Sequence, residues 1–253
     1  MHGSAISQTV TPLLVEADAT EFKATLTDGR VLRSRDLIGA RLVIAMDGRA
    51  VRVRIDGVEP DLEARNGTVW LHTFSVQMAD GSWENVCAPG PDGRRQGFPI
   101  AGRPRADGSF GSAEPGVLEL ACTSGALGKC VRFGYPPWAV PADAAPFELY
   151  NACIRMVRAD YCGDGTPTTK DGQRIDVYDD HGIQKPDNEP DADFEAGWTS
   201  GGAVCVRHVR VKENVSIQSL SHACPRLAAR MGLICTEEAA RALGATLFNR
   251  SKP

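Results

Sequence analysis

The chain has 253 residues, of which 42% are hydrophobic and 24% are charged, so it can form a packed core and is not disordered throughout. Its 28 basic and 32 acidic residues give a net charge of −4, which excludes nucleic-acid binding through overall positive charge, and we expect no nucleic-acid partner. No run of apolar residues approaches the length of about 18 that a membrane-spanning helix needs, so the sequence predicts no transmembrane segment.

The first hundred residues predict β-strands, because short apolar runs alternate with polar side chains and turn residues. Runs over 21–26 and 31–33 flank Asp28-Gly29, a pair typical of hairpin turns since both positions tolerate positive φ. Further strands are expected over 41–46, 50–56 and 68–78, with Asp56-Gly57 as the turn that ends the second of these. We expect a small all-β sandwich or barrel-like unit, then a loop-rich stretch over 88–116 and a short strand over 116–122.

Helices are expected only in the second half of the chain. Apolar residues recur at helical spacing over 148–160, and Gly163 then ends the helix. A second helix is expected over 219–231, bent or split by Pro225, and a third begins at Thr236 and runs toward Leu247, leaving 249–253 as a solvated tail. The predicted class is therefore α+β, with a β-rich domain over 8–112 and a disulfide-stapled α+β domain with about three helices over 113–253.

Cysteine is the most informative residue type. The even count and the lack of any C-x2-C pair favour structural disulfides over a zinc site or reduced buried thiols. We expect Cys224–Cys235 to link the last two helices and Cys122–Cys130 to close a short loop, with the other four cysteines forming two further bonds. The eight residues are Cys87, Cys122, Cys130, Cys153, Cys162, Cys205, Cys224 and Cys235.

Disulfides indicate an extracytoplasmic protein, whether secreted, periplasmic or lipid-anchored. The segment 1–8 lacks the basic and apolar regions of a signal peptide. Two interpretations remain: either the leader of an exported protein has been removed, or the protein is cytosolic with reduced thiols. The first is favoured.

Charge is distributed unevenly along the chain. Between Asp160 and Glu195 there are eleven acidic and three basic residues, a net charge of −8, whereas the segment from Ala203 to the end has a net charge of +5. This pattern favours a solvated loop region with salt bridges to the following basic segment. The alternative is a calcium site on a loop whose acids occupy every second position, although the EF-hand pattern fails there; its candidate ligands are Asp187, Glu189, Asp191, Asp193 and Glu195. Apart from this calcium alternative, no cofactor is expected.

Asp176, Tyr178, Asp179 and His181 form the densest group of titratable side chains, and carboxylates beside a histidine are suited to general acid–base chemistry. Asp176 and Tyr178 would share one face of a short strand. The plainer interpretation is a polar junction between a strand and a turn at Gly182. A Cys/His pair at Cys205 and His208 is disfavoured, because residues three apart on a strand point to opposite faces.

A resemblance adds to these observations. The segment Ala159-Asp160-Tyr161-Cys162 contains the string that names the ADYC-domain proteins, a family of largely uncharacterised bacterial proteins. The segments 121–138 and 171–179 are similar to the same family, and the resemblance extends over about 116–250. It implies a secreted or lipid-anchored bacterial protein and carries over no catalytic residues.

Three functional hypotheses follow. The preferred one is a non-enzymatic, extracytoplasmic, disulfide-stabilised binding or structural module for an unknown protein, peptide or carbohydrate ligand, with Tyr135 and Trp138 as candidate platform residues. The second is a hydrolase or lyase that uses the Asp/Tyr/His cluster within 160–181. The third is the calcium-binding module described above.

Overall fold

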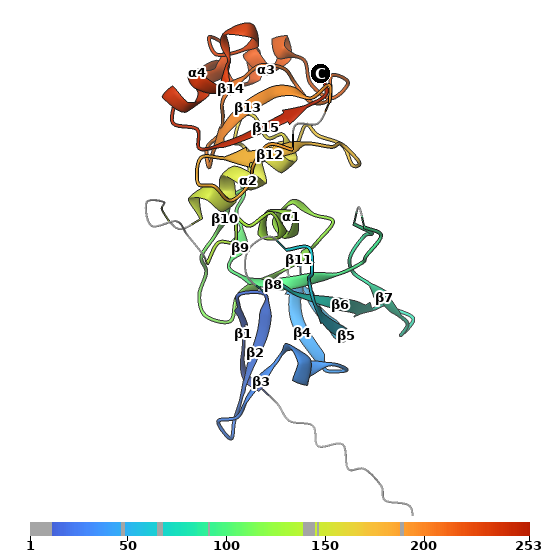
Figure 1. Cartoon of the computed structure of the whole chain (residues 1–253). Helices are drawn as coiled ribbons and strands as arrows, with labels where there is room; N and C mark the ends of the chain where they lie inside the picture. The colour runs from blue at the N-terminus through green and yellow to red at the C-terminus, as the bar shows by residue number, and fades with distance from the viewer. Residues whose placement is uncertain are drawn as a thin grey trace, which may run out of the picture.

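The computed structural model describes residues 12–46, 49–64, 68–90, 92–138, 145, 147–187 and 190–253. Segment 1–8, on which the leader argument depends, and Glu189 of the calcium prediction lie outside these residues. The described part is a mixed α+β protein, as predicted, with a β-rich first half and an α+β second half (Figure 1). Within it, no helix is both long and apolar enough to cross a membrane.

In the first half, two antiparallel sheets pack face to face as a small sandwich, and a third sheet has two short strands, β9 and β10. The first has the order β1-β2-β3, and the second has the order β11-β8-β6-β5-β4, with β7 paired to β6. Between them lie the buried side chains of Phe22, Ile55 and Phe74. The elements are β1 (Pro12–Asp18), β2 (Glu21–Leu26), β3 (Val31–Arg33), the 3-10 helix η1 (Ser34–Leu37), β4 (Arg41–Met46), β5 (Arg49–Pro60), β6 (Trp70–Gln77), β7 (Trp83–Asn85), β8 (Gly97–Ala101), β9 (Arg103–Pro104), β10 (Phe110–Gly111) and β11 (Leu118–Cys122).

The hairpin at Asp28-Gly29 is confirmed, and Gly29 has the positive φ of 84° that the turn requires. Asp56-Gly57, by contrast, is not a turn. Strand β5 continues through it to Pro60, and a bulge between Ile55 and Gly57 absorbs the extra residue. The expected loop-rich stretch also contains a full strand, β8, which pairs with β11. Periodicity did not reveal β8 because its first four residues are all buried.

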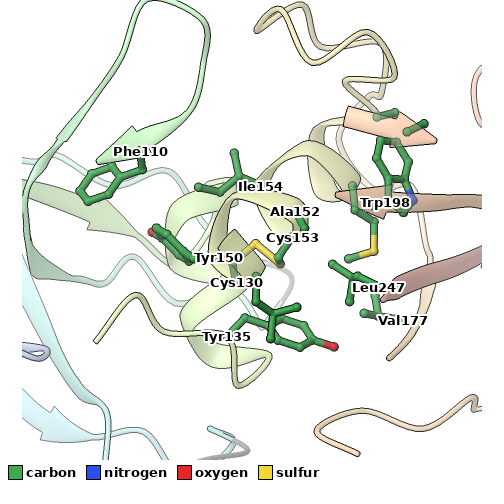
Figure 2. Packing of buried hydrophobic residues seen from close by; sticks show 14 of the residues in the cluster. Phe110, Cys130, Tyr135, Tyr150, Ala152, Cys153, Ile154, Val177, Trp198 and Leu247 are labelled. Atoms are coloured by element: carbon green, nitrogen blue, oxygen red, sulfur yellow. A yellow bond between two sulfur atoms is a disulfide. The ribbon is translucent and has the colours of Figure 1, made fainter. Parts of the chain in front are cut away.

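The second half is a four-stranded antiparallel sheet, of order β12-β15-β13-β14, between helices. Helix α2 covers the face that carries Val177, Trp198 and Leu247 (Figure 2), and α4 packs against the face that carries Tyr178 and Phe248. The elements are α1 (Ala126–Arg132), α2 (Glu148–Arg158), β12 (Asp176–Asp179), β13 (Asp193–Thr199), β14 (Gly202–Val206), α3 (Ile217–Ala223), the 3-10 helices η2 (Pro225–Leu227) and η3 (Gly232–Ile234), α4 (Glu237–Ala242) and β15 (Leu247–Ser251).

The C-terminal segment corrects one expectation outright. Residues 247–251 form β15, which pairs with β12 on one side and β13 on the other. Asn249 and Ser251 are buried there, so this is an inner strand and not a solvated tail. Helix α4 therefore ends at Ala242, well before Leu247, and Gly244 follows it with positive φ.

The other helix predictions are largely confirmed. Pro225 splits the second expected helix into α3 and η2. Thr236 caps α4, since its side chain accepts a hydrogen bond from the Ala239 amide at 3.1 Å. Helix α1 was not expected. It lies between the two halves, above β11 and β8 (Figure 1).

The two halves share one apolar core. Although β11 begins after residue 112, it belongs to the sheet of the first half. One cluster of buried side chains extends from Leu71 and Phe98 in that sheet, through Tyr150 on α2, to Trp198 and Leu247 in the second sheet. Figure 2 shows the middle of this cluster, where α1 and α2 meet. The division into two domains near residue 112 stays a prediction; the core described here contains residues from both sides of that position.

All eight cysteines form disulfides, as predicted, but the expected pairings are wrong. The bonds are Cys87–Cys122, Cys130–Cys153, Cys162–Cys224 and Cys205–Cys235. Each links cysteines at least 23 positions apart in sequence, so spacing along the chain was a poor guide to partners that the fold brings together.

Candidate functional site

The Asp160 carboxylate organises the turn that follows α2. Ala159 ends that helix in the left-handed conformation, with φ of 49°, and Asp160 is fully buried. Its oxygens accept hydrogen bonds from the amides of Gly163 and Gly165, both at 2.9 Å, and from the Arg155 guanidinium at 2.6 Å. The aspartate thus satisfies the donors of a tight loop and neutralises a buried arginine, which is a structural role.

Tyr161 belongs to a second buried polar group. Its hydroxyl donates to Glu195 at 2.9 Å and accepts from the Arg210 amide at 2.9 Å, while its ring stacks on Trp198. Burial raises the pKa of this phenol well above its ordinary value, which works against its ionisation. Tyr161 is therefore a core residue with a satisfied hydroxyl.

Glu195 and Arg210 form a salt bridge that is completely out of solvent. Two nitrogens of Arg210 lie 3.0 Å from the two carboxylate oxygens, and Asn249 donates to the same carboxylate at 2.7 Å. Burial alone would raise the pKa of Glu195, but the charge and hydrogen bonds of Arg210, with that from Asn249, hold the pKa below its ordinary value. Glu195 is therefore an ionised, fully paired carboxylate.

Cys162 completes this region through its disulfide to Cys224, so a nucleophilic thiol is excluded at this position. The next residue, Gly163, has a φ of 74°, and a Cβ there would come within 2.1 Å of the Gly201 carbonyl oxygen. Arg226 donates to the carbonyls of Tyr161 and Gly201, both at 2.9 Å. Each residue of the Ala159–Cys162 segment thus has a structural function at the junction of α2 with the second sheet.

The predicted Asp/Tyr/His cluster is divided between different environments. Asp179 accepts from the Tyr135 hydroxyl at 2.8 Å and from three amides of the following turn, among them those of His181 and Gln184 at 2.7 Å. Asp176 and Tyr178 lie on the opposite face of β12 from Val177, where Tyr178 stacks on Phe248. The plainer interpretation, a strand-to-turn junction, describes Asp179 well. Burial raises the pKa of Tyr178, so it remains protonated.

The acids predicted as calcium ligands are also dispersed. The Glu195 carboxylate is held by Arg210, Asp191 pairs with Lys252 at 3.9 Å, and the Asp187 amide donates to Asp176 at 2.9 Å. Across the described ranges, no three His, Cys, Asp or Glu side chains gather as a group that could hold a metal ion. Glu195 and Asp191 thus form salt bridges with basic residues of the C-terminal segment, as the charge pattern predicted.

Of the two platform candidates, Tyr135 lies in the core, with its hydroxyl on Asp179, and offers no surface to a ligand. Trp138 is 41% exposed.

Cys205 is bonded to Cys235, so it has no dyad with His208.

The structure does contain a pocket, of about 390 Å³, between α1 and β12. Its apolar wall consists of Phe133, Ile175 and Val177, and its polar lining comes from both halves of the chain. The lining residues are Glu63, Thr123, Lys129, Arg132, Phe133, Ile175, Val177, Gln184 and Asp187. A concave site with an apolar wall and a few convergent polar groups is typical of binding sites for small molecules.

The two basic residues of the pocket differ in their pairing. Arg132 binds Asp61 through Nε at 2.6 Å and also lies 3.0 Å from Glu63 and 3.4 Å from Asp92, so its charge is neutralised. Lys129, three positions earlier on the same helix, makes no ion pair with any residue that the structure describes. Within the described ranges, Lys129 is therefore the basic side chain of the pocket that has no ion pair.

Disulfides hold the walls of the pocket. Cys130, which lies between Lys129 and Arg132 on α1, is bonded to Cys153 on α2 (Figure 2). Thr123 follows Cys122, which is bonded to Cys87. Walls that are fixed before binding lose less conformational entropy when a ligand is bound.

Sequence reasoning missed this pocket, because its residues come from segments near 63, 123–133 and 175–187. One local signal was present: Lys129 and Arg132 are three apart, so a helix over 126–132 places them on one face. That helix was not expected.

A family model described as the ADYC domain matches residues 34–212, well over half of the chain. The match includes the Ala159–Cys162 segment and all nine residues that line the pocket. No curated protein and no solved structure matches the chain. The chain belongs to the ADYC domain family.

Proposed function

We propose that this protein is an extracytoplasmic, disulfide-stabilised binding module, not an enzyme, and that the pocket between α1 and β12 is its binding site. The observation that carries the proposal is the pocket itself, which has an apolar wall and contains Lys129. This lysine has no ion pair with any described residue. Disulfides persist in oxidising compartments and are rare in the cytosol, so four of them support a location outside the cytoplasm.

We infer the class of ligand from the side chains that line the pocket. The apolar surface of Phe133, Ile175 and Val177 suits a hydrocarbon or aromatic body, and the Lys129 ammonium suits one anionic group. A small carboxylate with an apolar body meets both conditions. The acid–base alternative has less support, because Asp179 already accepts four hydrogen bonds within its own turn and from Tyr135.

The test uses hexanoate and phenylacetate as probes, with hexylamine as the charge-reversed comparison. Calorimetry and thermal unfolding should show binding of the two carboxylates but not of the amine. Lys129→Met keeps the aliphatic stem and removes the charge, and it should weaken carboxylate binding about tenfold or more. The matched control is Lys212→Met, at an exposed position away from the pocket.

Ile175→Trp, which fills the pocket, should abolish binding while the protein stays folded. Carboxylate binding that is unchanged in both Lys129→Met and Ile175→Trp would refute the assignment of the site, and so would the absence of any binding to the intact protein. The compartment has its own test: protein isolated from its source cells and alkylated without reductant should show no free thiol.

A further inference from the structure

One part of the six-stranded sheet presents arginines on a face that no described element covers. Val53 and Ile55 of β5 point into the sandwich, so Arg52 and Arg54 point to the opposite face. In register with them on β4 are Val43 and Arg41, respectively. Trp83 on β7 is paired with Gln77 on β6 and lies at the same end of the sheet. We call Arg41, Arg52, Arg54 and Trp83 the arginine face.

The remainder of this side of the sheet is covered, and the arginine face is not. Leu71, nearer the start of β6, is buried in the core shared with α1 and α2. Figure 1 shows α1 above β8 and β11, while β5, β6 and β7 extend away beneath it. Val43, beside Arg52, is 69% exposed. The sheet therefore leaves a basic surface in contact with solvent.

The arginines are held in place but are incompletely neutralised. The guanidinium of Arg54 lies 4.6 Å and that of Arg41 lies 5.6 Å from the centre of the Trp83 ring. Arg52 donates to Gln77 at 3.1 Å. Asp56 pairs with Arg54, whereas Arg41 and Arg52 have no ion pair with any described residue. Among the described residues, the arginine face and Asp56 together carry three positive charges and one negative charge.

The strand register brings like charges of this face together. Arg41 and Arg54 lie directly opposite each other on adjacent strands, where like charges destabilise the pair. Adjacent strands are about 4.8 Å apart and alternate residues on one strand about 7 Å apart, so the Cα atoms of the three arginines lie within roughly 10 Å of one another. A ligand with closely spaced negative charges would remove the repulsion.

We propose that the arginine face binds an acidic polysaccharide, whose carboxylates pair with the guanidiniums of Arg41, Arg52 and Arg54. A narrow, extended polymer can contact this face alone, whereas a broad anionic membrane would also meet the rest of a chain whose net charge is −4. Single-stranded nucleic acid is favoured less, because such ligands stack their bases on open aromatic rings and the Trp83 ring already carries guanidiniums.

The test measures binding of the full chain to immobilised polygalacturonate at 50 and 500 mM salt, with neutral dextran as the comparison. The intact protein should bind polygalacturonate and lose most of that binding at high salt. Arg41→Ser combined with Arg52→Ser should weaken binding at least tenfold. The control is Arg103→Ser combined with Arg230→Ser, which removes the same charge at exposed positions elsewhere and should change binding less than twofold.

Several outcomes would overturn the proposal: no binding at 50 mM salt, equal binding to dextran, or equal losses in the two double variants. Tighter binding to phosphatidylglycerol vesicles or to a single-stranded oligonucleotide would also do so. Thermal unfolding of both double variants checks that they are folded. Lys129→Met should leave polygalacturonate binding unchanged, so this surface and the pocket are tested independently.

Discussion

Replacing Arg210 with methionine should destabilise the protein strongly, because it leaves a buried carboxylate without its cation. Arg210 and Glu195 are both almost completely buried, and their two 3.0 Å contacts are supplemented by hydrogen bonds from Arg210 to the carbonyls of Met156 and Val157. Removing one partner of such a pair costs about 3–5 kcal/mol. That is a large part of the roughly 5–15 kcal/mol by which domains are stable.

The effect should depend on pH with a defined sign. In the intact protein the pKa of Glu195 is held low, so its contribution to stability is present at neutral pH and is lost as the pH falls through the folded-state pKa. In Arg210→Met, burial acts without the cation and raises the pKa of Glu195 above its unfolded value. The stability of the variant then decreases as the pH rises, and the difference between the two proteins shrinks in acid.

Urea unfolding followed by tryptophan fluorescence, with the disulfides intact, measures this difference at pH 7 and pH 4. Adding Glu195→Gln to Arg210→Met removes the stranded charge and should recover part of the lost stability. A loss below about 1 kcal/mol at pH 7, or a difference that does not change with pH, would refute the reasoning.

Three further predictions concern stability. Burial lowers the pKa of His72 to about 4, so between pH 6.5 and 4 the unfolded chain takes up a proton that the folded chain does not, and the free energy of unfolding should fall by about 3 kcal/mol over that range. In urea titrations, His72→Gln should reduce this dependence of stability on pH, and an unchanged dependence would contradict the prediction. Replacing Cys130 and Cys153 with serine should lower the free energy of unfolding in urea by about 3 kcal/mol and increase proteolysis within α1. Resistance to proteolysis equal to that of the intact protein would contradict the proposal that this disulfide fixes α1 to α2. Asp160→Asn should destabilise by about 2–4 kcal/mol by thermal or urea unfolding, since the buried Arg155 loses the nearer of its two counter-ions and keeps only the exposed Asp107 at 3.6 Å; a neutral result would remove the structural role assigned to this residue.

Features set by neighbouring residues were predictable from the sequence. The Asp28-Gly29 hairpin, the alternating strand around Val53 and the Thr236 cap all depend on backbone preferences or side-chain spacing within a few positions. The use of all eight cysteines in disulfides followed from their number and the absence of metal-binding spacing. The family resemblance rested on a contiguous string, Ala159–Cys162, which the family match then confirmed.

Features set by distant contacts were not predictable in this way. The tail became an inner strand because β12 and β13, at least 48 positions earlier (247 − 199), supply both of its edges with partners. The disulfide partners follow the packing of α1 on α2 and of β14 near η3, and the pocket exists only where α1 meets β12.

The sequence by itself therefore determined the local turns, most of the strands and helices, the cross-linked character of the protein and its family. Only the tertiary structure decided which cysteines pair, which acidic side chains form buried ion pairs and which basic side chains have no ion pair with a described residue. The physical reason is that local structure depends on preferences of adjacent residues, whereas burial and charge pairing depend on which surfaces of the whole chain pack together.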